Sequence, residues 1–372
     1  MARLIVTVNK LNKRKSIPAS TSDKTGIAGE VLKGFSFEGV EVTDSPAPAP
    51  EKWYKDRDGY FYWGGGVREI PASAEKPLVI NILDKKDWGF IDFKIDELWQ
   101  ISKGSNIKVA VLDSGLNYNA DDFKNNSRIS YYNAFKDSGI KADCLDSQGH
   151  GTDCAGILCA QGNVIYGVAP EIDFLCIKIN NDTGGTTSKE ILKGLEKAVA
   201  LNSDVISLSF SIAENDQYFN SIHDKIKEAY QKDIAVIAAA GDSGSLAFPV
   251  NNYPASHPEC LSIGGIDRMR KRSKASTKSI YLDLMGPGED LISITNPGIP
   301  ISGTSYAAPF VAGVVAILKS VAKSKNLSLT NIELHDMLKR SADKIVGGNY
   351  NLIDYGFGIL DPVAAMNLLL KK

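Results

Sequence analysis

The chain has 372 residues, of which 43% are hydrophobic, so it can bury the core of one large globular domain or of two smaller ones. Its 42 basic and 44 acidic residues leave a formal net charge of -2, which argues against a large nucleic-acid-binding surface. We find no apolar run of membrane-spanning length, and the first twenty residues lack the long apolar stretch and cleavage site of a secretory signal. We therefore expect a cytoplasmic protein with no membrane span and no nucleic-acid partner.

Residues 1–77 differ in composition from the rest and predict a small all-β accessory domain. Asp58-Gly59, between two aromatic stretches, predicts a hairpin turn. The aromatic residues of 53–63 form either a groove for a peptide or cell-wall ligand or the core of a small barrel, and their frequency on strands favours the core. The order of these segments is similar to bacterial SH3-like domains. A pro-segment that is later removed is the less favoured alternative.

Residues 78–99 are expected to form a linker and a helix that leads into a second domain, residues 100–372. In that domain β-branched apolar runs alternate with amphipathic runs, which predicts a doubly wound, mostly parallel α/β sheet. We expect Ser188 to cap one of the helices and residues 279–285 to form a strand. The predicted strands include 107–112, 174–179, 204–210 and 234–239, and the predicted helices include 152–160, 188–202, 218–231 and 308–321.

Three segments place chemically useful side chains at the ends of these elements. Asp113 ends the first predicted strand of the sheet, where parallel sheets present functional groups. His150 lies between two glycines before a predicted helix, and Ser305 lies in a Gly-Thr-Ser turn at the start of another. A serine at a helix N-terminus is close to unpaired N–H groups, but it still needs a base and a group that orients this base.

The motifs VLDSG, GHGT and GTSYAAP around these residues closely resemble the subtilisin family of serine peptidases, over roughly the last three quarters of the chain. The resemblance implies a serine nucleophile at Ser305, a general base at His150 and an orienting carboxylate at Asp113. It also implies that the backbone N–H of Ser305 donates to the oxyanion.

One position departs from the family pattern, because AAAGN is replaced by AAAGD and ends in Asp242. The family's asparagine donates a hydrogen bond to the oxyanion, whereas an ionised carboxylate has no proton to donate and repels negative charge. Our hypothesis is that desolvation beside Ser305 keeps Asp242 protonated, so that it donates as a neutral acid. The alternative is that Asp242 pairs with a neighbour and takes no part in the chemistry.

The resemblance also assigns substrate contacts. Gly184 and Gly185 match the edge against which the family lays an extended substrate, although a plain turn is the alternative. Ser209, Phe210 and Ser211 match the substrate-binding strand, and Ser211 replaces a glycine, which narrows the primary pocket. The base of that pocket, near Ser243 and Asn252, lacks the acidic cluster expected for cutting after paired basic residues, so specificity is open between apolar and small residues. The stretch QGNVIYGVAP is shorter than the family's calcium loop, so we expect no metal and no cofactor.

The five cysteines have no metal-binding or disulfide spacing, so we expect reduced thiols. Cys154 is one helical turn after His150 and is expected beneath its ring, either as an inert packing residue or as a thiol whose modification disturbs the base. The basic run 268–274 is expected to be a solvated loop, and contact with a nucleic acid or an acidic lipid is the less favoured alternative.

These expectations lead to two functional hypotheses. The first is a cytosolic serine endopeptidase that forms an acyl-enzyme and acts on protein or peptide substrates. The second is a subtilisin-fold peptide-binding or scaffold protein that has lost useful turnover through Asp242. The presence of all three catalytic groups favours the enzyme.

Overall fold

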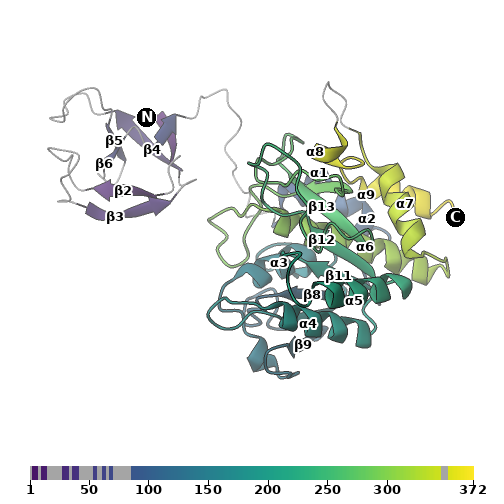
Figure 1. Cartoon of the computed structure of the whole chain (residues 1–372). Helices are drawn as coiled ribbons and strands as arrows, with labels where there is room; N and C mark the ends of the chain where they lie inside the picture. The colour runs from purple at the N-terminus through teal and green to yellow at the C-terminus, as the bar shows by residue number, and fades with distance from the viewer. Residues whose placement is uncertain are drawn as a thin grey trace. The chain divides into compact units, whose positions relative to one another are not determined.

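The structure is a computed structural model that describes residues 85–344 and 351–372 together with seven strands between residues 2 and 69. The chain divides into two compact units, Met1–Val79 and Ile80–Lys372. Each unit has its own sheet, and we describe each by itself (Figure 1).

The first unit contains an antiparallel sheet in the order β3-β2-β6-β5-β4-β1-β7. Strands β5 and β6 pair with Tyr54 opposite Tyr62, while the turn predicted at Asp58-Gly59 lies outside the described residues. Trp53, Tyr54 and Tyr62 are buried, which favours the core over the ligand groove. The SH3-like resemblance stays a prediction. The strands are β1 (Ala2–Val6), β2 (Lys10–Arg14), β3 (Ile27–Leu32), β4 (Ser36–Glu41), β5 (Trp53–Asp56), β6 (Phe61–Trp63) and β7 (Val67–Glu69).

The second unit is built on a seven-stranded parallel sheet in the order β14-β13-β12-β11-β8-β10-β9. Its central strands are nearly continuous apolar runs, as expected where both faces of a parallel sheet are covered. The predicted α/β fold is therefore confirmed. The strands are β8 (Lys108–Asp113), β9 (Ile129–Asn133), β10 (Asp173–Lys178), β11 (Val205–Leu208), β12 (Ala235–Ala239), β13 (Cys260–Ile266) and β14 (Leu284–Pro287).

Helices cover both faces of this sheet because alternate strand residues point to opposite sides (Figure 1). In β8, Val109 and Val111 belong to one buried cluster, and Ala110 and Leu112 belong to the other. On the second face lie α4 (Ser188–Ala200) and α5 (Phe219–Gln231). Helices α8 (Leu352–Tyr355) and η2 (Lys141–Cys144), a short 3-10 helix, lie in connections. The helices that contribute to the buried cluster on the first face are α1 (Trp88–Asp92), α2 (Ile95–Trp99), α3 (His150–Cys159), α6 (Thr304–Ser324), α7 (Asn331–Ser341) and α9 (Pro362–Leu369).

Helix α6 is the long central helix of this unit. By length and composition it is apolar enough to cross a membrane, so our statement that no apolar run reaches that length was too strong. It is nevertheless largely buried and packs on β11, β12, β13 and β14. We conclude that α6 is a core helix that carries residue 305 at its first turn.

Two local predictions were wrong in detail. Thr187, not Ser188, is the N-cap residue of α4, and its hydroxyl bonds to Glu190. Strand β14 begins only at Leu284, because the preceding residues form a turn whose Ser279 N–H donates to the carbonyl of Ile353. The first difference comes from a local side-chain hydrogen bond, and the second from a hydrogen bond to a segment distant in sequence.

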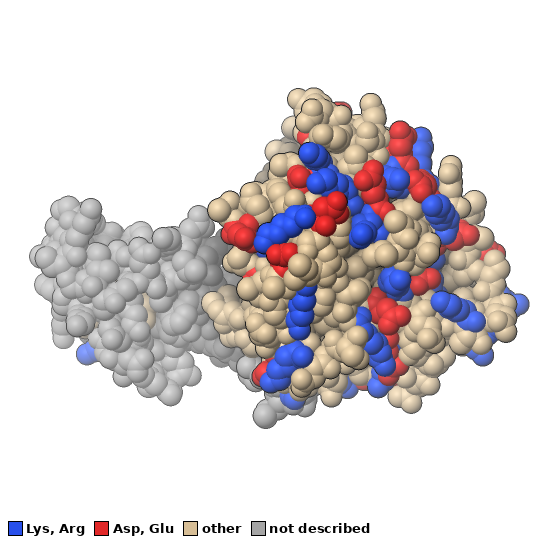
Figure 2. Space-filling view, turned by 90° about the horizontal axis from the view of Figure 1, so that it is seen from below, with Lys and Arg blue, Asp and Glu red and all other residues tan. Residues whose placement is uncertain are grey.

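The basic run 268–274 lies on the surface, as predicted for a solvated loop, and its three arginines also pair with acidic side chains. Arg268, Arg270 and Arg272 form ion pairs of 3.8, 2.6 and 3.3 Å with carboxylates from α1, from the residues after α7, and from α8, namely Asp92, Asp343 and Asp354. Acidic and basic side chains are also interspersed over the face of this unit shown in Figure 2. The run therefore connects elements of its own domain.

Candidate active site

Asp113 ends β8 at the point where the direction of chain winding changes. Strands β10 and β9 lie on one side of β8, and β11 to β14 lie on the other. In open α/β sheets, functional groups gather outside the carboxyl ends of the strands at such a point. The Asp113 side chain is only 7% exposed, and its Oδ1 accepts a hydrogen bond of 2.7 Å from the N–H of Ser114. The carboxylate is therefore held in one orientation.

His150 is the first residue of α3, and the loop before it is tightly organised. Asp146 accepts hydrogen bonds from the N–H groups of Gly149 and Thr152, among others. Gly151 lies so close to the loop after β8 that a Cβ there would be 2.5 Å from the carbonyl oxygen of Gly115. Only glycine permits this approach. The helix start is thus packed directly against the strand that carries Asp113.

This packing brings Asp113 and His150 together. The His150 Nδ1 lies 2.7 Å from the Asp113 Oδ1, and about a third of the imidazole is exposed. The pKa of His150 is raised well above its usual range, first by the charge that a Cys154 thiolate would carry and then by the Asp113 carboxylate. Burial raises the pKa of Cys154 to about 11, so its thiol is neutral at neutral pH. The Asp113 carboxylate is then the group that raises the pKa of His150.

Ser305 lies in the first turn of α6, where Gly303 has a φ of 154° that favours glycine. Pro309, four residues later, has no N–H to donate to the Ser305 carbonyl. The hydroxyl of Ser209 donates to that carbonyl instead at 2.8 Å, and the Cys154 thiol donates at 3.4 Å. Ser209, which directly follows β11, and Cys154 of α3 therefore fix the backbone that carries the candidate nucleophile.

Cys154 connects the two halves of the site. It is fully buried, and its Sγ is 3.9 Å from the His150 Nδ1 as well as in contact with the Ser305 carbonyl. All five cysteines are free and buried. Donor atoms of Asp113, His150 and Cys154 lie within 4.8 Å of one another, but the short Asp113–His150 hydrogen bond already uses the two nearest of them. The geometry thus describes a hydrogen-bonded pair with a thiol close to it.

A bulky mercurial on Cys154 is expected to lower activity by about 100-fold, the scale expected when a catalytic group moves by about 1 Å. The added mass must displace the His150 ring, the Ser305 carbonyl or both. The measurement is residual activity after modification, with mass spectrometry to establish that Cys154 has reacted. Cys154→Ala should be insensitive to the reagent, and full modification with unchanged activity would contradict the expectation.

Asp242 follows β12 and contacts the residues just before Ser305. Its Oδ1 accepts a hydrogen bond of 2.9 Å from the N–H of Thr304, and its Oδ2 lies 3.2 Å from where a Cβ on Gly303 would be. The side chain is exposed, not buried as the desolvation hypothesis required, and its protonation stays a prediction. Asp242 thus caps α6 from outside the helix.

The predicted substrate-contact residues lie on two loops. Ser209 and Phe210 follow β11 directly and are partly buried, whereas Ser211 is exposed. Gly184 and Gly185 lie in a turn closed by the pairing of Asn180 with Thr186. The N–H of Gly185 donates to the side chain of Asn181, and its carbonyl accepts from the N–H of the same residue. These residues form a hydrogen-bonded turn, and contact of this turn with an extended substrate stays a prediction.

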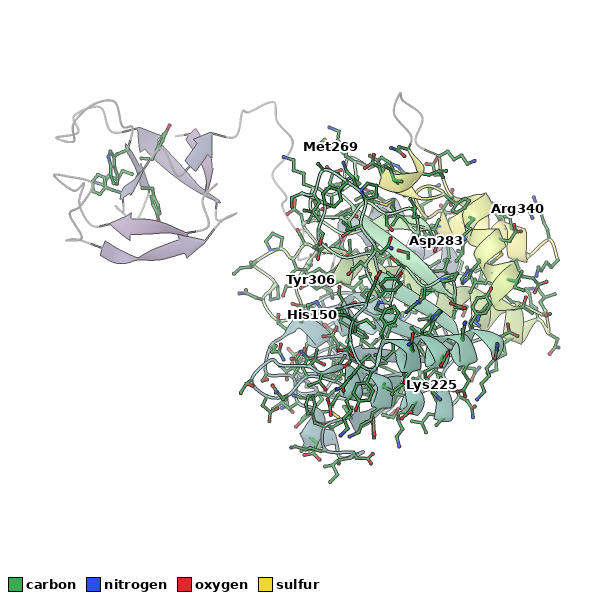
Figure 3. The ribbon with its side chains drawn as sticks, viewed as in Figure 1. His150, Lys225, Met269, Asp283, Tyr306 and Arg340 are labelled. Atoms are coloured by element: carbon green, nitrogen blue, oxygen red, sulfur yellow. The ribbon has the colours of Figure 1, made fainter. Side chains whose placement is uncertain are left out.

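Two residues near the site had no predicted role. Lys178 ends β10 with its side chain 1% exposed, and its Nζ donates to the carbonyl of Leu145 and to Asp182. It thereby connects the loop before α3 to the turn of Gly184. Tyr306 directly follows Ser305, and its ring lies beside that of His150 (Figure 3). Adjacency to Ser305 was the only sequence signal for Tyr306, and nothing in the sequence indicated burial of Lys178.

Comparison with known proteins identifies related chains. The sequence pattern of the subtilase family matches residues 104–358. An intracellular serine protease of Paenibacillus polymyxa is 35% identical over 255 residues, covering 66% of this chain and 76% of that protein. The major intracellular serine protease of Bacillus subtilis is 34% identical over 267 residues (69% and 81%), and subtilisin E of the same species is 32% identical over 267 residues (70% and 66%).

Proposed function

The chain belongs to the subtilase family of serine peptidases, and from this premise we propose that it is an endopeptidase with Ser305 as nucleophile, His150 as base and Asp113 as orienting carboxylate. The observation that carries the proposal is the 2.7 Å contact between Asp113 and His150 beside the first turn of α6. This contact fixes the tautomer in which Nδ1 carries the proton and Nε2 is free to accept one.

In the proposed reaction, the Ser305 Oγ attacks the scissile carbonyl carbon while its proton moves to the His150 Nε2. The C–N bond then breaks, and the leaving amine takes that proton, which leaves an ester on Ser305. Water then attacks the ester carbon while His150 takes its proton. The bond between that carbon and the Ser305 Oγ breaks as His150 returns the proton to Oγ, and the peptide acid is released. Asp113 stabilises the imidazolium in both halves of the cycle.

The proposed oxyanion site has one favourable and one unfavourable group. The N–H of Ser305 belongs to the first turn of α6, whose N–H groups have no partner four residues earlier, and it would donate to the oxyanion. Asp242 would supply a carboxylate where the family pattern has a donor. We infer that the ionised carboxylate opposes the negative charge of the transition state and lowers the rate without removing the reaction.

We further infer that the enzyme acts inside the cell on protein or peptide substrates. Two of the relatives are named as intracellular proteases. All five cysteines of this chain are free, which suits a reducing compartment. For the substrate side chain, Ser211 in place of glycine supports a preference for small or apolar residues.

Intact-mass labelling with a fluorophosphonate tests the proposed function. The parent chain should take up one phosphonyl group per molecule, and Ser305→Ala should take up none, because only an activated serine reacts. Labelling that persists in Ser305→Ala would overturn the assignment of the nucleophile. No labelling of the parent, with labelling gained in Asp242→Asn, would support the peptide-binding alternative.

A further inference from the structure

The Tyr306 ring is a neighbour of His150 that the proposed mechanism does not use. The two ring centroids are 5.5 Å apart, and the ring planes are inclined by 42° (Figure 3). Tyr306 is partly buried in the first turn of α6, and its Cδ2 lies 3.7 Å from where a Cβ on Gly303 would be. The backbone that presents Ser305 therefore also fixes the position of this ring.

His150 is surrounded by different groups on its different sides. Asp113 from β8 faces Nδ1, the Sγ of Cys154 from α3 lies 3.9 Å from the same nitrogen, and the ring of Tyr306 from α6 lies alongside. Asp153, the next charged group on α3, is turned away and is bonded to Ser293 and its neighbours. Asp113 is thus the carboxylate that pairs with His150, and Tyr306 supplies the aromatic ring beside it.

In the proposed reaction His150 becomes a cation when it takes the proton of Ser305. An aromatic face attracts a cation whose centre lies within about 6 Å of the ring centroid, and the attraction grows as water is excluded. We propose that the Tyr306 ring stabilises the imidazolium form of His150 through a cation–π contact and so acts as a positioning residue for the general base. The inference rests on the proposed function, because it takes His150 as the base.

The ring rather than the hydroxyl of Tyr306 carries this effect. Within the described part of the chain, no hydrogen bond to the Tyr306 hydroxyl is present. Burial raises the pKa of Tyr306 above its usual range, so the phenol remains neutral while His150 titrates. A change in the titration of His150 on replacing Tyr306 therefore does not reflect loss of a phenolate charge.

The test is an NMR titration of the His150 ring in the Ser305→Ala protein, which cannot digest itself. Three chains are compared, with Tyr306, Tyr306→Phe and Tyr306→Leu. Leucine keeps an apolar side chain against the imidazole but has no π face, so it should lower the midpoint of the His150 titration by roughly 0.5 to 1 pH unit. Phenylalanine keeps the ring and should restore a midpoint close to that of Tyr306.

The other three histidines serve as internal controls. Unchanged midpoints for His223, His257 and His335 show that the fold is intact. In chains that retain Ser305, the acidic limb of the kcat/KM profile should move to lower pH in Tyr306→Leu but not in Tyr306→Phe. The proposal would be overturned if the His150 midpoint in Tyr306→Leu equalled that of the chain with Tyr306, or if this midpoint fell equally in both variants. Because the titration needs no activity, it separates this inference from the labelling test of the proposed function.

Discussion

Asp113→Asn is expected to lower kcat/KM by about 10,000-fold while the protein stays folded, a loss of the size known for the matching aspartate in subtilisin itself. The substitution keeps the shape of the side chain but removes the charge 2.7 Å from the His150 Nδ1. The asparagine amide can also donate to Nδ1, which moves the imidazole proton to Nε2. In that tautomer Nε2 cannot accept the proton of Ser305.

The same substitution should change the pH dependence in a defined direction. His150 acts as a base only when neutral, and its raised pKa places the rise in activity at a higher pH than for an ordinary histidine. Removing the Asp113 charge lowers the pKa of His150, so the acidic limb of the kcat/KM profile should move to lower pH. Profiles of kcat/KM against pH for the parent and the variant measure both effects.

Asp121→Asn is the matched control for this experiment. Asp121 pairs with Lys124 on the surface, and its side chain is 64% exposed. The same chemical change there should leave kcat/KM and its pH profile unchanged. Thermal unfolding of both variants separates loss of catalysis from loss of structure. An Asp113→Asn protein that is folded and fully active would show that Asp113 does not orient the base.

The central sheet could be predicted from the sequence because each strand is buried on both faces. A run such as that of β8 needs no knowledge of its neighbours, since apolar β-branched residues are favoured there in any doubly wound sheet. Asp113 was predictable for the same reason, because it is the first polar residue after that run. The position of His150 at the start of α3 followed from the two glycines that flank it.

Features that depend on residues distant in sequence could not be predicted. The basic run pairs with Asp92, Asp343 and Asp354, which come from three separate segments. The exposure of Asp242 depends on how the loop after β12 leaves the sheet, and the contact of Tyr306 with His150 depends on the packing of α6 against α3. A sequence motif names such residues, but their surroundings are set by tertiary structure.

Asp242→Asn is expected to raise kcat/KM by roughly 100- to 1,000-fold, the reverse of the loss known when the matching donor is removed from subtilisin itself. Asparagine has the same shape, so its Oδ1 can still accept the hydrogen bond from the N–H of Thr304. The amide nitrogen then replaces Oδ2, which lies near Gly303. The helix cap is retained, while a repelling oxygen becomes a donor to the oxyanion.

Asp242→Ala separates the two parts of this effect, because it removes the repulsion without adding a donor. Its kcat/KM should lie between those of the parent and Asp242→Asn, and loss of the cap should lower the free energy of unfolding by about 1 kcal/mol. The decisive measurement is kcat/KM against pH for all three proteins. If Asp242 instead donated as a neutral acid, the parent's rate would fall with rising pH, and Asp242→Asn would remove that fall. A parent as fast as Asp242→Asn, with no such fall, would mean that the carboxylate does not face the oxyanion and serves only as the cap of α6.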